Sequence, residues 1–202
     1  MPKIYNCSYP GCSNITCQED GFCLGHSSRE EKEKAIANIK KLLSEKKRIE
    51  GVCMSGIDIS ELELSGHDFY DCVFLGIRAE NMSIENASFN LCFGDYSVFR
   101  NCIFKEINTR FSSFSGSFFE HTVIEDSNIL QTNYNGATIK DSAFKSCDLY
   151  HSRFISSKIF KSKFYDCNLK RTYFLESKQE DVKFPYCNVE DAYFKREEKF
   201  LI

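Results

Sequence analysis

The sequence predicts an all-β solenoid, in which the chain winds through about seven four-sided coils of 20 residues. The first observation is a five-residue period, since 24 of the 28 positions from Ile59 to Phe194 are Phe, Ile, Leu, Val or Tyr. The second is a companion series two residues earlier, from Ile57 to Ala192, where 21 of 28 positions are Ala, Ser, Thr or Cys. The third is the composition, because 13 of the 19 phenylalanines fall in the first series. One large and one small side chain therefore face inward in every unit.

Neither an α-helix nor a flat strand can use this period, because a helix needs apolar steps of three and four and a strand needs alternation. A chain that turns a corner every five residues can use it. Four sides close a coil of 20 residues, and coils stacked as parallel strands about 4.8 Å apart make a rod of about 34 Å. Four inward positions are underfilled and predict looser coils: Ala79, Gly94, Thr109 and Gln179.

Residues 57–194 resemble the pentapeptide-repeat family, whose units read Ala-(Asp/Asn)-(Leu/Phe)-X-X. The closest local matches are Ala87-Ser88-Phe89, Cys147-Asp148-Leu149, Cys167-Asn168-Leu169 and Cys187-Asn188-Val189. The resemblance covers about two thirds of the chain and implies a right-handed quadrilateral parallel β-helix. We assign this β-helix to residues 52–195.

Residues 1–27 are expected to form a small Cys/His-rich module. Four side chains follow the spacing C-x4-C-x10-C-x2-H: Cys7, Cys12, Cys23 and His26. This set fits a tetrahedral zinc site, and four protein ligands leave no open position, so the zinc would be structural. A segment this short needs such a staple because it cannot bury a core. Cys17 could replace one ligand, and a redox or disulfide arrangement or free thiols are the alternatives.

Residues 28–51 are expected to form an amphipathic α-helix. Ser28-Arg29-Glu30-Glu31 is a capping box, and the apolar stripe that follows comprises Ala35, Ile36, Ile39, Leu42, Leu43 and Ile49. We expect this helix to cover the open end of the solenoid, where core and strand edges are otherwise exposed. A membrane-surface or partner-binding helix is the alternative. At the other end, residues 196–202 would cap the last coil or join a second copy end to end, as a homodimer.

The cysteines of the rod repeat at the 20-residue spacing of the coils, as in the pair Cys72 and Cys92 and the series Cys147, Cys167 and Cys187. We interpret them as small inward side chains, because Ser and Ala fill the same position elsewhere; a metal or redox site is the alternative. The first residues carry no apolar signal segment, and no stretch approaches the ~20 apolar residues of a membrane span. The sequence therefore predicts a cytoplasmic protein with reduced thiols and no membrane partner.

The outer positions sort into four walls, each named here after an inward residue of an early coil. The wall centred on Phe74 (the Phe74 wall) carries few charges and is expected to expose Val73, Leu75, Phe93, Tyr96, Ile155, Tyr173, Leu175 and Tyr193. A contiguous exposed apolar surface indicates a protein-binding site. The alternative is that the N-terminal module folds back over it.

The walls centred on Ile59 and Leu64 (the Ile59 wall and the Leu64 wall) are acidic in the early coils. Their acidic residues include Glu61, Glu63, Glu80, Glu85, Glu106, Glu120, Glu125 and Asp126. Residues 57–139 hold 12 acids and 4 bases, whereas residues 140–194 hold 8 acids and 10 bases. One branch of the resembled family protects DNA gyrase by imitating duplex DNA. A 34 Å length of DNA carries about 20 negative charges, so a net charge of −6 on the rod disfavours full-length mimicry.

Catalysis is the least supported class of function. The sequence has no Ser-His-Asp order, phosphate-binding loop or converging carboxylate pair, and flat β-helix walls offer no deep pocket. The near-neutral overall charge of −3 also argues against a nucleic-acid partner. We therefore predict a non-catalytic scaffold that presents flat walls to a protein partner, with a topoisomerase-directed DNA mimic as the alternative.

Overall fold

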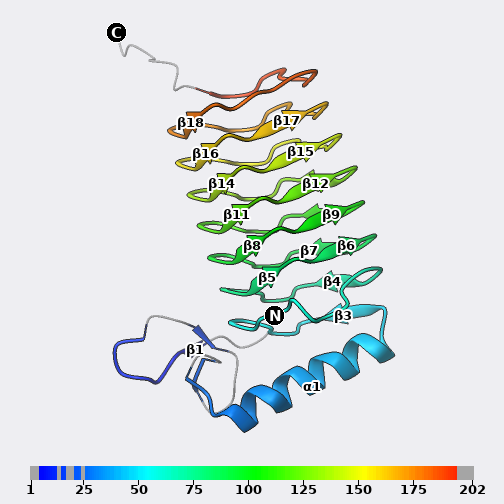
Figure 1. Cartoon of the computed structure of the whole chain (residues 1–202), viewed down its shortest axis with the longest axis vertical. Helices are drawn as coiled ribbons and strands as arrows, with labels where there is room; N and C mark the ends of the chain where they lie inside the picture. The colour runs from blue at the N-terminus through cyan, green and yellow to red at the C-terminus, as the bar shows by residue number, and fades with distance from the viewer. Residues whose placement is uncertain (1–4, 13–14, 17–20, 24–25, 195–202) are drawn as a thin grey trace.

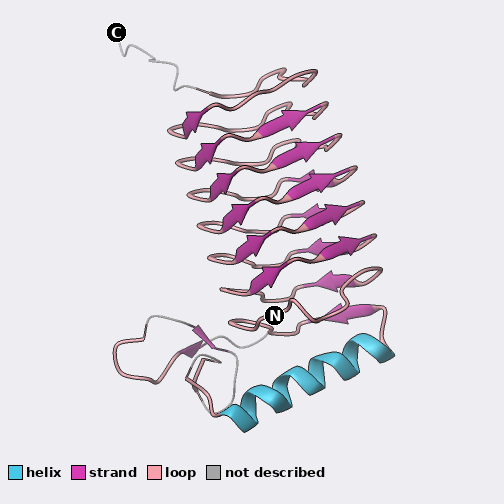
Figure 2. Cartoon of the chain, in the orientation of Figure 1, coloured by secondary structure: helices cyan, strands magenta, loops and turns pink. Residues whose placement is uncertain are grey.

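The computed structural model describes residues 5–12, 15–16, 21–23 and 26–194. Residues 48–194 wind into one parallel β-solenoid of about seven turns, which stands as a stack of flat coils in Figures 1 and 2. The predicted fold class is thus confirmed. The predicted C-terminal tail, residues 196–202, lies outside the described residues.

Three sides of the solenoid are sheets of three-residue strands. The first side, the Phe69 wall, comprises β3 (Arg48–Glu50), β4 (Asp68–Tyr70), β7 (Ser88–Asn90), β10 (Asn108–Arg110) and β13 (Asn128–Leu130). The Ile59 wall comprises β5 (Arg78–Glu80), β8 (Val98–Arg100), β11 (Phe118–Glu120), β14 (Thr138–Lys140), β16 (Lys158–Phe160) and β18 (Lys178–Glu180). The Leu64 wall comprises β6 (Ser83–Glu85), β9 (Ile103–Lys105), β12 (Val123–Glu125), β15 (Ala143–Lys145) and β17 (Lys163–Tyr165).

The fourth side, the Phe74 wall, is held by single parallel bridges that recur every 20 residues, from Cys53↔Val73 to Tyr173↔Tyr193. All the parallel pairs of the other three walls have the same 20-residue register, as in Phe69↔Phe89. Each coil therefore lies directly on the previous one, and a residue's neighbours are those 20 positions away.

The corners between the walls are made by residues in the left-handed backbone region. They recur every five positions, as in Asn81 (φ 55°), Asn86 (φ 54°) and Asn101 (φ 51°). Asn, Asp and Gly tolerate this conformation better than other residues, because a Cβ atom crowds the neighbouring carbonyl oxygen. The five-residue period thus has a structural cause, namely one corner for every unit.

The core is a set of stacked aromatic columns. The rings of Phe69 and Phe89 stack with centroids 5.0 Å apart, and those of Phe144 and Phe164 with centroids 4.9 Å apart. Rings on opposite walls meet edge to face across the core, as Phe144 and Phe154 do at an interplanar angle of 90°. Both arrangements are favoured by the quadrupoles of the rings, so the repeated phenylalanine suits both contacts.

The small inward side chains form ladders beside these columns. Six described cysteines of the rod carry free thiols: Cys72, Cys92, Cys102, Cys147, Cys167 and Cys187. They donate to backbone carbonyls, as Cys92 Sγ does to the oxygens of Phe69 and Asn90. Burial raises the pKa of Cys102, and that of Cys187 to about 11. These thiols therefore act as small core side chains, as the sequence predicts.

The helix α1 (Arg29–Glu45) lies across the N-terminal end of the solenoid in Figure 1. Ser28 is its N-cap and accepts a hydrogen bond from the backbone N–H of Glu31. Ile39 and Leu43 are buried in the same cluster as the solenoid core, so α1 caps the rod. No helix in the described part of the chain is long and apolar enough to cross a membrane.

The boundary between helix and solenoid differs from the prediction. Ile49 does not extend the apolar stripe of α1; it lies in β3, which pairs with β4. The solenoid thus begins at Arg48 rather than at residue 52. The reason is the repeat itself, because Ile49 and Met54 continue the five-residue series backwards from Ile59, and both are fully buried.

The predicted looseness of the early coils is found at one of the underfilled positions, Thr109. An apolar cavity of about 50 Å³ lies inside these coils, and Thr109 is one of its lining residues. Gly94 has a different explanation, because the ring of Phe114 lies 2.7 Å from the place of a Cβ atom at this position. Glycine is thus required there by a close approach.

Candidate functional site

The N-terminal cysteines and histidine converge as the sequence predicts. The ligand atoms of Cys7, Cys12, Cys23 and His26 all lie within 4.8 Å of one another. Cys7 Sγ is 3.5 Å and Cys23 Sγ is 3.4 Å from His26 Nδ1, and Cys12 Sγ is 3.9 Å from Cys23 Sγ. Zinc bond lengths of 2.3 Å to sulfur and 2.0–2.1 Å to nitrogen give tetrahedron edges of about 3.8 Å (S–S) and about 3.6 Å (S–N). The spacing of the ligand atoms fits zinc.

The surroundings of the cluster favour a bound cation. Burial raises the pKa of the Cys7 thiol, but hydrogen bonds from the backbone N–H groups of Cys23 and Tyr9 and from the His26 ring outweigh it and lower the pKa to about 6. The ring of Tyr9 stacks on that of His26 at 3.9 Å and fixes the orientation of the imidazole. A thiol that ionises readily and an imidazole ring held in one orientation are features of zinc sites.

Cys17, the predicted substitute ligand, lies outside the described residues. The junction cysteine Cys53 is disulfide-bonded. The described set of ligand-type side chains at the cluster is therefore Cys7, Cys12, Cys23 and His26.

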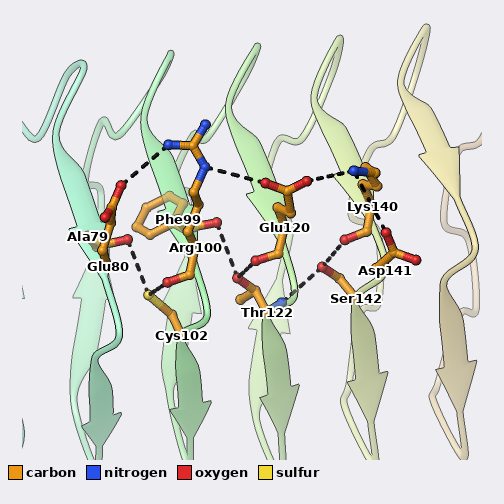
Figure 3. Close-up of polar contacts among 10 residues, drawn as sticks. All are labelled: Ala79, Glu80, Phe99, Arg100, Cys102, Glu120, Thr122, Lys140, Asp141 and Ser142. Carbon is orange, nitrogen blue, oxygen red and sulfur yellow. Dashed lines mark hydrogen bonds and ion pairs between the residues drawn. The ribbon is translucent and has the colours of Figure 1, made fainter.

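The acidic residues of the Ile59 wall form part of an alternating charge ladder (Figure 3). Arg100 bridges two carboxylates, with Nη1 3.3 Å from Glu80 and Nε 3.4 Å from Glu120. Lys140 Nζ then lies 2.7 Å from Glu120 and 3.9 Å from Asp141. A hydrogen bond from Lys140 lowers the pKa of Glu120, and the same bond raises that of Lys140.

This ladder changes the interpretation of the acidic surface. Glu125 on the Leu64 wall is also paired, with Lys145 Nζ at 3.8 Å. Three of the eight predicted acidic residues thus have a cationic neighbour on the next coil, because the 20-residue register brings opposite charges together. The other five are exposed: Glu61, Glu63, Glu85, Glu106 and Asp126. The surface is therefore less acidic than a count of carboxylates suggests.

The Phe74 wall is not one continuous apolar surface. Val73 was expected to be exposed, but it is fully buried, because Cys53 and Phe93 flank it in the ladder. Tyr96 is 73% exposed, and Leu75 and Phe93 are half-buried. Polar side chains follow on the next coils of this wall: Ser113, Ser115, Asn133 and Asn135.

A second apolar group lies beyond this polar interval. Tyr173 and Tyr193 stack with ring centroids 4.8 Å apart, and Tyr193 is 41% exposed. Ile155 and Leu175 are half-buried beside them. The described part of the Phe74 wall therefore offers two apolar groups separated by a polar interval.

Sequence reasoning missed a further surface at the corner between the Phe69 and Phe74 walls. Two open hollows of about 600 and about 430 Å³ meet there and share Phe111. Phe111 and Leu91 occupy corner positions with left-handed backbone, at φ 55° each. A signal was present in the sequence, because both are large apolar residues outside the two inward series.

The comparisons with known proteins agree with this architecture. Residues 125–194 match a family model described as "Pentapeptide repeat region". Two trypsin-treated forms of QnrB1, a plasmid-mediated fluoroquinolone resistance protein, are similar in structure. One is 22% identical, with a TM-score of 0.68 over 74% of this chain and 75% of that chain. The other is 20% identical, with a TM-score of 0.59 over 74% and 76%.

At this level of identity the two structures show a shared fold alone, and no curated protein matches the sequence. The matched family model covers the later coils of the solenoid, and the same repeat and walls continue through the earlier coils. Residues 125–194 are therefore a pentapeptide-repeat region, and the chain carries a Cys/His cluster in its N-terminal segment.

Proposed function

We propose that this chain is a non-catalytic, cytoplasmic scaffold that binds a protein partner through the apolar groups of the Phe74 wall. The observation that carries the proposal is the stacked, partly exposed pair Tyr173 and Tyr193, with Leu175 beside it. Tyrosine offers a large contact area at a low entropic cost and is enriched in protein interfaces. Six described thiols of the rod are free and favour a reducing compartment, whereas Cys53 is disulfide-bonded.

The test is crosslinking and co-purification from cells, followed by mass spectrometry, with the full-length chain. A Tyr173→Ser, Tyr193→Ser variant should lose the proteins that the wild type captures. The matched control is Tyr165→Ser, Tyr186→Ser, because this second pair of exposed tyrosines lies 5.4 Å apart at the Leu64 wall. Equal capture by the wild type and the first variant would rule out this contact surface.

We further propose that the Cys/His cluster holds one structural zinc ion. The proposal is supported by the spacing of the ligand atoms and by the lowered pKa of Cys7. Metal analysis of purified protein should find one zinc per chain, and Cys23→Ser should lower this content. Cys72→Ser is the control, since Cys72 is a rod thiol far from the cluster in sequence. A zinc content well below one equivalent in the wild type would refute the structural zinc site.

A homodimer formed through the C-terminal end belongs to the same proposal. Phe194 is 38% and Val189 is 47% exposed on the last described coil, although both continue the inward series. Covering these side chains with a second copy would bury apolar surface and pair strand edges. Light scattering should give twice the mass of the chain, and Phe194→Ser should shift the protein toward monomer. A monomeric wild type would exclude this arrangement.

A DNA mimic directed at a topoisomerase is the second candidate. It is favoured by the likeness to QnrB1, which is described as a fluoroquinolone resistance protein. The charge ladder of Glu80, Arg100 and Glu120 speaks against it, because duplex DNA presents uncompensated negative charge. A supercoiling assay with DNA gyrase and a quinolone separates the two candidates. Protection or inhibition at micromolar protein would establish the mimic, and no effect would eliminate it.

A further inference from the structure

We infer that the corner between the Phe69 and Phe74 walls binds an extended acidic peptide whose two carboxylates are three residues apart. The site comprises Arg110, Phe111, Gln131 and Arg153, which line the two hollows that meet at Phe111. The inference rests on the proposed scaffold function in that both require a protein partner. It concerns a different surface from the tyrosine pair and a different chemistry.

The two arginines of the site supply its positive charge. The guanidinium groups of Arg110 and Arg153 are exposed and have no ion pair or hydrogen bond within the described part of the chain. Most other described arginines have a carboxylate neighbour, as Arg100 and Arg171 do. No carboxylate lines either hollow. A planar guanidinium with no protein partner is suited to bidentate binding of a carboxylate.

Phe111 occupies a position that is unfavourable for its side chain in the folded protein. Its side chain is 53% exposed, and its backbone is left-handed at φ 55°. A bulky residue is disfavoured in this backbone region, which Asn, Asp and Gly adopt at a lower energetic cost. Folding thus gains little apolar burial from Phe111 and loses backbone stability, so the ring needs another explanation. Contact with an apolar side chain of a bound peptide supplies one.

The spacing of the two arginines matches that of side chains on an extended peptide. Arg110 and Arg153 lie about two coils apart, which is about 10 Å along the rod. An extended peptide rises about 3.3 Å per residue, so its residues i and i+3 are also about 10 Å apart. Their side chains point to opposite sides of the peptide, and the two arginines lie on opposite sides of the corner column that contains Phe111 and Gln131. Two coil spacings of the rod therefore match three residues of an extended peptide.

The neighbouring polar groups complete the site. The amide of Gln131 is exposed and has no hydrogen-bond partner among the described residues, so it can donate to and accept from a peptide backbone. The carboxylates of Asp95 and Asp148 on the adjoining walls are already bonded, to Ser113 and Ser115 and to Asn168 respectively. Two arginines matched to two carboxylates favour a peptide over a nucleic-acid strand, whose charge is continuous and needs a longer basic track.

The test is fluorescence anisotropy with the full chain and a labelled decapeptide that carries Glu-Leu-Ser-Glu in a Gly/Ser background. We expect saturable binding, and at least tenfold weaker binding of the peptide with both Glu replaced by Gln. Arg110→Gln and Arg153→Gln should each weaken binding at least tenfold. Arg78→Gln is the matched control, because Arg78 is exposed and equally without a side-chain partner, but lies on the Ile59 wall.

Phe111→Asn separates binding from folding. It should weaken the peptide at least fivefold while leaving the thermal unfolding midpoint unchanged or higher, because Asn suits the left-handed backbone. Absence of peptide binding, an equal effect of Arg78→Gln, or tighter binding of an oligothymidylate of eight nucleotides would each overturn the inference. None of these outcomes touches the proposed scaffold function, which is tested on Tyr173 and Tyr193.

Discussion

His67 Nε2 lies 2.9 Å from the carbonyl oxygen of Leu43, so a side chain of the first coil holds the last turn of the capping helix. The other ring nitrogen, Nδ1, lies 2.9 Å from the carbonyl oxygen of Ser65. His67 occupies an inward position that is small in most coils. The larger side chain is accommodated there because the helix, rather than another coil, covers this end of the rod.

Replacing His67 with Asn should loosen the cap, since the shorter side chain cannot span both carbonyl groups. We expect a loss of about 1–2 kcal/mol in the free energy of unfolding and faster amide hydrogen exchange in α1. His121→Asn is the control, because His121 is an exposed corner residue with left-handed backbone. Unchanged exchange in α1 would show that the helix is held by its apolar face alone.

Gly94→Ala should destabilise the solenoid by about 1–3 kcal/mol, because the new methyl group would overlap the ring of Phe114. Urea denaturation measures the change. Adding Phe114→Leu to the alanine variant should restore part of the loss, since the shorter side chain vacates this space. If the double variant is merely the sum of the two single ones, the proposed clash is absent.

Thr109→Ile should stabilise the protein by about 1 kcal/mol, because the larger side chain fills part of the 50 Å³ cavity that Thr109 lines. The hydroxyl of Thr132, which now pairs with that of Thr109 at 2.9 Å, keeps its bond to the carbonyl oxygen of Leu130. The same substitution at Thr122, which is buried but does not line the cavity, should destabilise by overpacking. The thermal unfolding temperatures of both variants, compared with that of the wild type, test this prediction.

The charge ladder predicts a dependence of stability on pH. The pKa of Glu120 is lower in the folded protein than its ordinary value of 4.5, because Lys140 donates a hydrogen bond to the carboxylate. The stabilisation is therefore present above pH 4.5 and is lost as the pH falls through the folded pKa. The fall in unfolding temperature between pH 7 and pH 3 should be smaller for Glu120→Gln than for the wild type. A fall of the same size in Glu106→Gln and Glu120→Gln would contradict this, since Glu106 has no cationic partner in the described structure.

The sequence by itself determined the architecture, because the period of the pattern equals the period of the structure. Every five residues the chain turns at a left-handed corner, and every 20 it stacks on itself. An inward residue such as Phe69 can therefore be identified without coordinates. The ligand set of Cys7, Cys12, Cys23 and His26 could be predicted for a similar reason, since the short spacings keep these side chains close together.

Only the tertiary structure decided what depends on neighbours 20 residues away or on the ends of the rod. Glu80 and Glu120 count as acidic in the sequence, but the stacking of coils places Arg100 between them and compensates their charge. Val73 counts as an outer apolar residue, but its ladder neighbours bury it. The exposed ring of Phe111 can be interpreted as part of a binding site only because Arg110 and Arg153 lie on the two adjoining walls. The burial of a side chain and the local net charge depend on all the residues around it. The repeat specifies where those neighbouring residues lie, but not which side chains they carry.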